Sequence, residues 1–142
     1  MSFITTVYAH CDLPCGVYDP AQARIEAASV YGTVKKYLES TDEAFRVRAL
    51  MIKDERAELV KQHLWVLWTD YFKPAHLEQF PQLHEPLWTA TKAAGEAKHT
   101  HTLEAAQALL DAVDAVGDLF AQSKPGYDYA AVKANTNLQI GL

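Results

Sequence analysis

Apolar side chains recur at helical spacing along most of this chain, and clear stop signals separate the periodic stretches. The first stretch begins at Asp19-Pro20, where a capping acid precedes a proline suited to a first helical turn, and runs to about Glu39. Gly32 weakens this helix by about 1 kcal/mol relative to alanine. The apolar stripe predicts one buried face, formed by Ala23, Ala27, Val30, Val34 and Leu38.

A second periodic stretch follows the capping sequence Ser-Thr-Asp-Glu at residues 40–43. It contains no glycine or proline until Lys73-Pro74 stops it after Phe72. Roughly 30 residues at 1.5 Å each make a helix of about 45 Å. We therefore predict one long helix, whose apolar surface is formed by Phe45, Ile52, Leu59, Leu64, Leu67, Trp68 and Tyr71.

The carboxyl-terminal half predicts two further helices. Residues 74–85, with two prolines and aromatic anchors, are expected to form an ordered loop. Pro86 begins a third helix, from about residue 85 to 98, with an alanine-rich face, and residues 100–102 form a polar connection. The fourth helix has the clearest period, in steps of three and four through Leu103, Ala106, Leu110, Val113, Gly117 and Phe120.

Four helices with short connections, without strand-type alternation or an internal repeat, predict an all-α fold, an antiparallel four-helix bundle. The 142 residues suit one domain with a single core. From residue 125 to 142 the composition shifts to Gly, Asn, Tyr and Thr. This tail is expected to be irregular, and ordered at most against a neighbouring subunit.

Charge and hydropathy exclude some functions. The formal net charge is −5, and the basic residues are interleaved with acids along the helical stretches, which is typical of solvated helix faces. Nucleic-acid binding needs clustered Lys and Arg, so we expect no nucleic-acid partner. No apolar run approaches the ~20 residues of a membrane helix, so we expect no membrane association.

Residues 1–9, MSFITTVYA, have the character of a short leader. Val7-Tyr8-Ala9 looks like the small-residue site before a signal-peptide cleavage point. However, the segment has no basic start, and its apolar stretch is shorter than the ~7–15 residues that export requires. We therefore expect a pro-segment that does not direct export, and a cytoplasmic protein. In a reducing cytoplasm a cysteine pair is more plausibly a metal or redox site than a structural disulfide.

Both cysteines of the chain follow this segment closely, and His10 directly precedes the first of them. Cys11 and Cys15 would share one face of a helix, but Pro14 and Gly16 disfavour a helix here and indicate a tight hook. Such a hook brings two thiolates to a single ion. The Cys-x-x-x-Cys spacing alone is only moderately specific, because it is common by chance.

Cleavage between Ala9 and His10 would complete a set of metal donors. The new α-amine of His10 and the amide nitrogen of Cys11 close one chelate ring, the same amide and the Cys11 thiolate close a second, and the Cys15 thiolate completes a plane. The His10 imidazole reaches an axial position. Two nitrogens and two sulfurs in one plane favour Ni(II) or Cu(II) over zinc, and predict a one-electron redox site.

The stretch HCDLPCGVYDPAQARIEA, residues 10–27, resembles the mature amino terminus of the nickel superoxide dismutase family. The similarity continues at residues 52–53, 56–59 and 67–74, and it covers most of the chain up to about Lys124. The His-Cys-Asp-Leu-Pro-Cys-Gly sequence makes this resemblance highly specific. The chain departs from the family in its short leader, in its tail past the usual end, and around His99 and His101.

This resemblance implies an enzyme that converts superoxide to dioxygen and hydrogen peroxide by one-electron Ni(II)/Ni(III) cycling, with one nickel ion per subunit. It also implies a right-handed four-helix bundle, a homohexamer, and a dedicated peptidase that removes the leader. The expected boundaries are a leader over 1–9, a bundle domain over 10–124 with its metal-binding hook at 10–18, and the tail over 125–142.

The resemblance also implies residue roles. His10, Cys11 and Cys15 match the nickel ligands. Glu26 and Arg56 match the residues that hold the axial imidazole in a hydrogen-bond chain, the second coming from the same subunit or a partner. The remaining matches are two tyrosines that screen the open face of the metal, Tyr18 and Tyr71, and two charged residues around the hook and its approach, Asp12 and Lys73.

Without the resemblance, other interpretations of these residues would be favoured. Glu26 and Arg56 would be routine surface charges, and the two tyrosines would be packing residues at helix ends. The alternative function is a non-catalytic nickel- or copper-binding or thiol-redox helical protein, in which an uncut leader leaves the site without its amine. A purely structural helical oligomer would bind no nickel, and the pair His99 and His101 would bind metal only adventitiously.

Overall fold

The computed structural model describes residues 15–142, and the chain over this range is all-α. Residues 10–12, which carry two of the expected ligands and Asp12, lie outside the described residues. Six α-helices and one π-helical turn follow one another: α1 (Ala21–Glu39), α2 (Glu43–Val66), η1 (Leu67–Tyr71), α3 (Pro74–Gln79), α4 (His84–His99), α5 (Leu103–Ser123) and α6 (Tyr129–Ile140).

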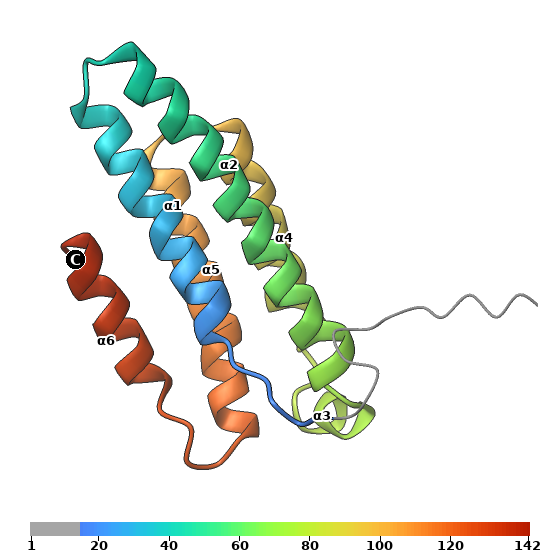
Figure 1. The fold of residues 1–142 in the computed structure, drawn as a ribbon. Coiled ribbons are helices and arrows are strands. Elements are labelled where there is room, and N and C mark those ends of the chain that lie inside the picture. Colours follow the sequence, from blue (N-terminus) through green and yellow to red (C-terminus); the bar gives the residue numbers. More distant parts are fainter. Residues whose placement is uncertain (1–14) are drawn as a thin grey trace, which may run out of the picture.

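The four long helices α1, α2, α4 and α5 form the predicted bundle, in which neighbours along the chain run in opposite directions (Figure 1). Each of them contacts two others: α1 packs on α2 and α5, and α4 packs on the same two helices. The all-α prediction is therefore confirmed for the described residues. The core between these helices contains Val30, Leu64, Leu87, Leu110 and Phe120, all fully buried.

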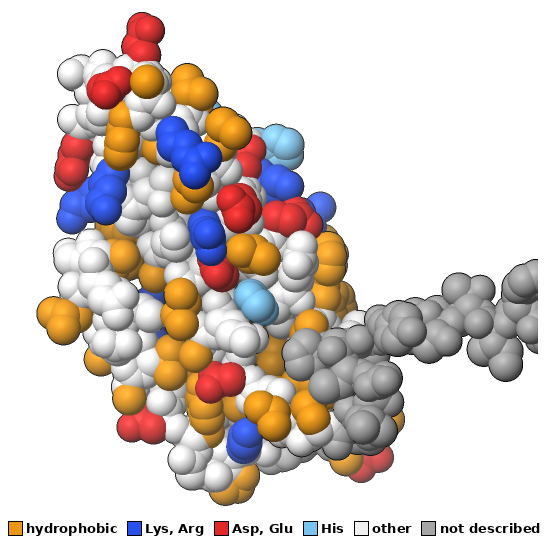
Figure 2. All heavy atoms as spheres, viewed as in Figure 1, with side chains coloured by type: hydrophobic (Ala, Val, Ile, Leu, Met, Phe, Trp, Pro, Cys, Tyr) orange, Lys and Arg blue, Asp and Glu red, His pale blue; other side chains and the backbone are white. Residues whose placement is uncertain are grey.

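The apolar stripe predicted for the first helix is mostly buried. Ala23, Ala27, Val30 and Val34 of α1 are buried as expected, but Leu38 is 50% exposed because it lies in the last turn. The stripe predicted for the second helix is only partly right, because Leu64 and Leu67 are buried but Phe45 is 41% exposed. Burial of a large aliphatic side chain contributes about 1.5–3 kcal/mol, so the stripes supply much of the driving force for folding. On the face shown in Figure 2, acidic and basic side chains are interspersed, as expected for solvated helix faces.

Side-chain caps set where the helices begin. Asp42 accepts hydrogen bonds from the amides of Ala44 (3.0 Å) and Phe45 (3.3 Å) at the start of α2. At α1, Asp19 Oδ1 accepts from the amide of Ala21 (2.8 Å), and the helix begins at Ala21, one residue after the proline expected to open it. These bonds satisfy amides that have no partner inside the helix.

A buried lysine of α2 caps the carboxyl end of α4. Lys53 of α2 is 2% exposed, and its Nζ donates to the carbonyl oxygens of Ala97 (2.6 Å), Lys98 (2.9 Å) and Thr100 (2.7 Å). Asp54 lies 3.1 Å from the same ammonium. The last carbonyls of a helix have no intrahelical partner and carry partial negative charge, so a cation is favoured there.

The expected loop at residues 74–85 is partly wrong. Pro74–Gln79 forms the short helix α3, which the proline can open because its missing amide is not needed in a first turn. His76 Nδ1 accepts a hydrogen bond from the amide of Lys73 (2.8 Å), which caps the same turn. Only residues 80–83 form a connection, and α4 begins at His84.

The expected irregular tail is also wrong. Tyr129–Ile140 forms α6, which packs against α1 and α5 of the same chain and lies beside them in Figure 1. Asp128 accepts from the amide of Ala131 (3.0 Å) at its start, and Gly141 ends it with φ +74°, a value that suits glycine. Among the helices of residues 15–142, none is long and apolar enough to cross a membrane.

Candidate metal centre

Cys15 lies at the start of the described chain, on an extended segment that leads into α1 and passes beside α3 (Figure 1). Its side chain is exposed, and its Sγ accepts a hydrogen bond from the amide of Val17 (3.4 Å). Gly16 between them has φ +70°, which is strained for any residue with a Cβ. The chain therefore turns sharply at the second predicted sulfur ligand.

Tyr18 and Tyr71 are brought together, although 53 positions separate them in the sequence. Their ring centroids lie 5.6 Å apart with the planes tilted by 56°. Tyr71 is the last residue of η1, where the chain leaves α2 through a π-type bond from the amide of Phe72 to the carbonyl of Leu67 (3.0 Å). Tyr71, at the end of this wider turn, lies next to Tyr18.

Tyr71 is held from several sides. Its hydroxyl forms a hydrogen bond with Ser123 Oγ (2.8 Å), and its ring packs on Phe120 at a centroid distance of 4.4 Å. His76 stacks on the same ring at 5.4 Å with the planes 21° apart. The sequence analysis did not single out His76, and the only signal for it was its position three residues after the α3 cap.

Lys73 is exposed and precedes α3 at the same end of the bundle as Tyr71. Its backbone amide is held by the hydrogen bond to His76 Nδ1. A cation in this position raises the local concentration of small anions even on a protein with net negative charge.

Glu26 and Arg56 form an ion pair between α1 and α2 of a single chain. Arg56 Nη1 lies 3.2 Å from Glu26 Oε2 and 3.4 Å from Oε1. The Glu26 side chain is 14% exposed and that of Arg56 is 34% exposed. The pair is therefore partly shielded from water, and both members belong to the same chain in this structure.

Tyr127, from the connection between α5 and α6, also reaches this end of the bundle. Its hydroxyl donates to Asp19 Oδ1, and its ring packs edge-on against Phe120 at 5.0 Å. Burial and the neighbouring Asp19 carboxylate raise the pKa of the Tyr127 phenol. Because it lies in the tail that was expected to be irregular, the sequence analysis assigned it no role.

Residues 5–124 match the family model for nickel-containing superoxide dismutase, which is most of the chain. The protein belongs to the nickel-containing superoxide dismutase family. The chain is 49% identical over 119 residues to superoxide dismutase [Ni] of Streptomyces coelicolor (strain ATCC BAA-471 / A3(2) / M145), covering 84% of this chain and 91% of the relative. It is 50% identical over 118 residues to superoxide dismutase [Ni] of Streptomyces seoulensis, covering 83% and 90%.

Solved structures of nickel superoxide dismutase have the same fold. The native structure matches with a TM-score of 0.78 and 47% identity, over 82% of this chain and 100% of that one. A nickel-containing superoxide dismutase after partial X-ray-induced reduction matches with a TM-score of 0.77 and 49% identity, over 80% and 97%. The family match ends at residue 124, so α6 lies beyond it.

The described part of this nickel superoxide dismutase family member contains one of the three expected ligand residues, Cys15. Within residues 15–142 there is no cluster of three or more His, Cys, Asp or Glu side chains that could hold a metal ion. Cys15 has an exposed Sγ that could bind a metal ion, and thiolate sulfur is a ligand for soft metal ions.

Proposed function

We propose that this nickel superoxide dismutase converts superoxide at a nickel ion held in the hook formed by residues 10–18. Two superoxide anions and two protons give one dioxygen and one hydrogen peroxide. The activity and the nickel cofactor follow from membership of the family, and the match over residues 5–124 shows that membership. The ligand set and the roles below are proposals for this chain.

The proposed ligands are the α-amine and imidazole of His10, the amide nitrogen and thiolate of Cys11, and the thiolate of Cys15. Nickel bound there supplies a one-electron change between its divalent and trivalent states. The α-amine exists only after the bond between Ala9 and His10 has been cut. A leader peptidase and removal of residues 1–9 are therefore part of the proposal.

Tyr18 and Tyr71 border the mouth of the site and limit what can enter. The tilted pair supports this role, because the hydrogen bond to Ser123 and the packing on Phe120 leave Tyr71 little freedom to move aside. A small anion passes such an opening, whereas larger reductants are excluded. The phenol hydroxyls also provide groups that can exchange protons with nearby water.

Lys73 and Asp12 are proposed to set the charge around the hook and its approach. The exposed ammonium of Lys73 attracts superoxide from solution, and this effect weakens as salt rises. The Glu26 carboxylate, held by Arg56, is proposed to orient the His10 imidazole through a hydrogen bond. Such a partner fixes the orientation of a ligating imidazole and increases its basicity.

A homohexamer and a cytoplasmic location complete the proposal. Several large apolar side chains of the bundle helices face solvent in the single chain, which supports burial against other subunits. The most exposed of these on α2 and α4 are Val47 (61%), Met51 (60%) and Trp88 (58%).

Intact mass and metal analysis of the protein from its native host test the proposal. We expect a chain that begins at His10, carries one nickel ion and dismutates superoxide. A chain that keeps residues 1–9, or that carries zinc and has no activity, would contradict it and favour the alternative of a non-catalytic metal-binding or thiol-redox protein.

Substitutions separate the roles of the ligands. Cys11→Ser and Cys15→Ser should abolish nickel binding, since each removes a thiolate from the plane. His10→Gln should keep nickel but slow turnover by about 10- to 100-fold, the range typical for loss of a supporting contact at a metal. Nickel content and turnover are measured on the same samples. An equal loss of nickel in all three variants would rule out an axial role for the imidazole.

A further inference from the structure

The connection between α5 and α6, residues 124–128, contacts the segment that carries the hook. This connection and α6 lie past residue 124, where the family match ends, and the native solved structure is matched over its whole length by 82% of this chain. Tyr127, which makes this contact, therefore lies past the residues that the family model matches, in residues 125–142, which we call the extension.

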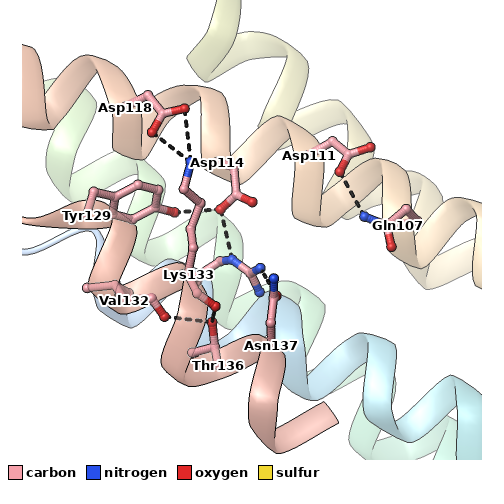
Figure 3. Close-up of polar contacts among 10 residues, drawn as sticks. Gln107, Asp111, Asp114, Asp118, Tyr129, Val132, Lys133, Thr136 and Asn137 are labelled. Atoms are coloured by element: carbon pink, nitrogen blue, oxygen red, sulfur yellow. Dashed lines mark hydrogen bonds and ion pairs between the residues drawn. The ribbon is translucent and has the colours of Figure 1, made fainter. Parts of the chain in front are cut away.

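The extension is firmly attached to the bundle. The Tyr129 ring lies directly over Gly117 of α5, where a Cβ would approach Tyr129 Cζ to 2.0 Å. The Tyr129 hydroxyl donates to Asp114 Oδ1 (2.9 Å), which also accepts from Arg24 Nε of α1 (2.8 Å). Figure 3 shows the bond between Tyr129 and Asp114 together with Lys133, whose Nζ lies 3.0 Å from Asp118 Oδ1.

Tyr127 lies two residues before this anchor and makes two contacts. Its hydroxyl donates to Asp19, the residue that also accepts from the first amide of α1. Its ring packs on Phe120, and the Phe120 ring also packs on Tyr71 at a centroid distance of 4.4 Å. Tyr127 thus joins the base of the hook segment to the surface that supports Tyr71.

We propose that Tyr127 is a positioning residue supplied by the extension, which holds Asp19 and the adjacent Tyr18 against the Phe120–Tyr71 surface and so keeps the hook close to its nickel-binding conformation. The inference rests on the proposed nickel site in residues 10–18. In this role Tyr127 lowers the free-energy cost of ordering the hook and does not contact substrate.

The size of the effect follows from preorganisation. The apparent affinity for a ligand equals the intrinsic affinity multiplied by the fraction of the protein that is in the binding-competent conformation. A hydrogen bond to a charged carboxylate is stronger than one between neutral groups, so its loss changes that fraction appreciably. We therefore expect removal of the Tyr127 hydroxyl to raise the nickel dissociation constant by about tenfold.

The test uses the protein that begins at His10, titrated with nickel alone while the thiolate-to-nickel absorption is followed. Tyr127→Phe should raise the dissociation constant about tenfold. Tyr129→Phe is the matched control, because it also removes one tyrosine–carboxylate bond from the extension but leaves Asp19 in place. Its dissociation constant should stay within about twofold of the wild-type value even if its melting temperature falls.

Removal of residues 125–142 provides a second variant that retains the matched family domain. It should show at least the loss of affinity of Tyr127→Phe while its circular dichroism remains helical. Nickel should also raise the melting temperature less in both variants than in the wild type, since binding and stability are linked.

The outcomes separate the two proposals. If the wild-type protein starting at His10 binds no nickel, the proposed function fails. If it binds nickel and Tyr127→Phe or the shortened protein binds equally tightly, the positioning role of Tyr127 is wrong. Equal weakening in Tyr127→Phe and Tyr129→Phe would show that general loosening of the extension, and no specific contact to Asp19, controls the affinity, and would likewise overturn the inference.

Discussion

Lys53 places a positive charge inside the bundle, where three backbone carbonyls of the α4 end surround its ammonium at 2.6–2.9 Å. These oxygens and the nearby Asp54 carboxylate replace water around the Lys53 side chain, which is 2% exposed. The same contact ties α2 to the turn that leads into α5. A single residue therefore joins three elements of the fold.

Lys53→Met should destabilise the protein by about 3 kcal/mol, since the apolar side chain leaves these carbonyls buried without a donor. Urea unfolding followed by circular dichroism measures the change. Lys92→Met is the control on exposed α4 surface and should change stability by less than about 0.5 kcal/mol. A loss below about 1 kcal/mol for Lys53→Met would show that water replaces the ammonium.

The buried Tyr129 phenol should make the stability of the protein sensitive to alkaline pH. Burial and the Asp114 carboxylate raise the pKa of its phenol above the ordinary value of 10.0. The native state therefore keeps a proton that the unfolded chain loses above about pH 10. The contribution of Tyr129 to the free energy of unfolding is complete below that pH and is lost as the pH rises further. One retained proton corresponds to a slope of about 1.4 kcal/mol per pH unit.

Tyr129→Phe should reduce this slope between about pH 10 and 11, because its side chain cannot ionise in either state. Urea unfolding at a series of pH values compares the two proteins. Parallel curves for the wild type and the variant would mean that Tyr129 does not titrate differently on folding.

At the scale of elements, α6 makes one very close contact with α5, between the Tyr129 ring and Gly117. Gly117→Ala would place a methyl group within 2.4 Å of three atoms of the Tyr129 ring, so α6 must shift or detach. We expect a loss of about 2–3 kcal/mol, which is typical of overpacking at a rigid aromatic ring. Hydrogen exchange of the α6 amides should rise more than that of the four bundle helices.

Gly95→Ala is the matched control for this prediction. The nearest atoms to its new Cβ are Nζ and Cε of the flexible Lys61 side chain, at 3.6 and 3.9 Å. Because alanine favours a helix over glycine, this substitution should add about 0.5–1 kcal/mol of stability. The same gain should appear for Gly117→Ala once residues 125–142 are removed, and a persistent loss there would show that Tyr129 is not the cause.

At the scale of the whole molecule, the four bundle helices could be predicted from the sequence because each has a core-facing stripe and clear stops. Residues such as Val30, Leu64 and Leu110 are apolar at positions where the helical period requires burial, and all three are buried. Asp42 was likewise predicted as a cap and acts as one. Local pattern and tertiary packing agree for these elements.

The sequence could not predict α6 in the same way, because this helix has almost no stripe of its own. Within it only Tyr129 and Thr136 are buried, while Leu138 is 79% exposed. Its position is decided by Gly117, Asp114 and Arg24, which lie far away in the sequence. Their local patterns give no sign of a partner.

The candidate site likewise contains contacts that were predicted from the sequence and residues that were missed. The juxtaposition of Tyr18 with Tyr71 and of Glu26 with Arg56 was expected from the family resemblance, and the structure has both contacts. Whether these residues serve nickel remains the proposal above. His76 and Tyr127 were missed, since their importance comes from ring stacking and from a hydrogen bond across 108 positions of sequence.

The direction of α6 has a practical consequence for anyone who labels this protein. Its 12 residues span about 18 Å, so the chain ends well away from the connection that contacts Asp19 (Figure 1). An affinity tag or fluorophore attached after Leu142 projects from the flank of the molecule. Modification at that terminus leaves the opposite terminus available for the proposed cleavage before His10.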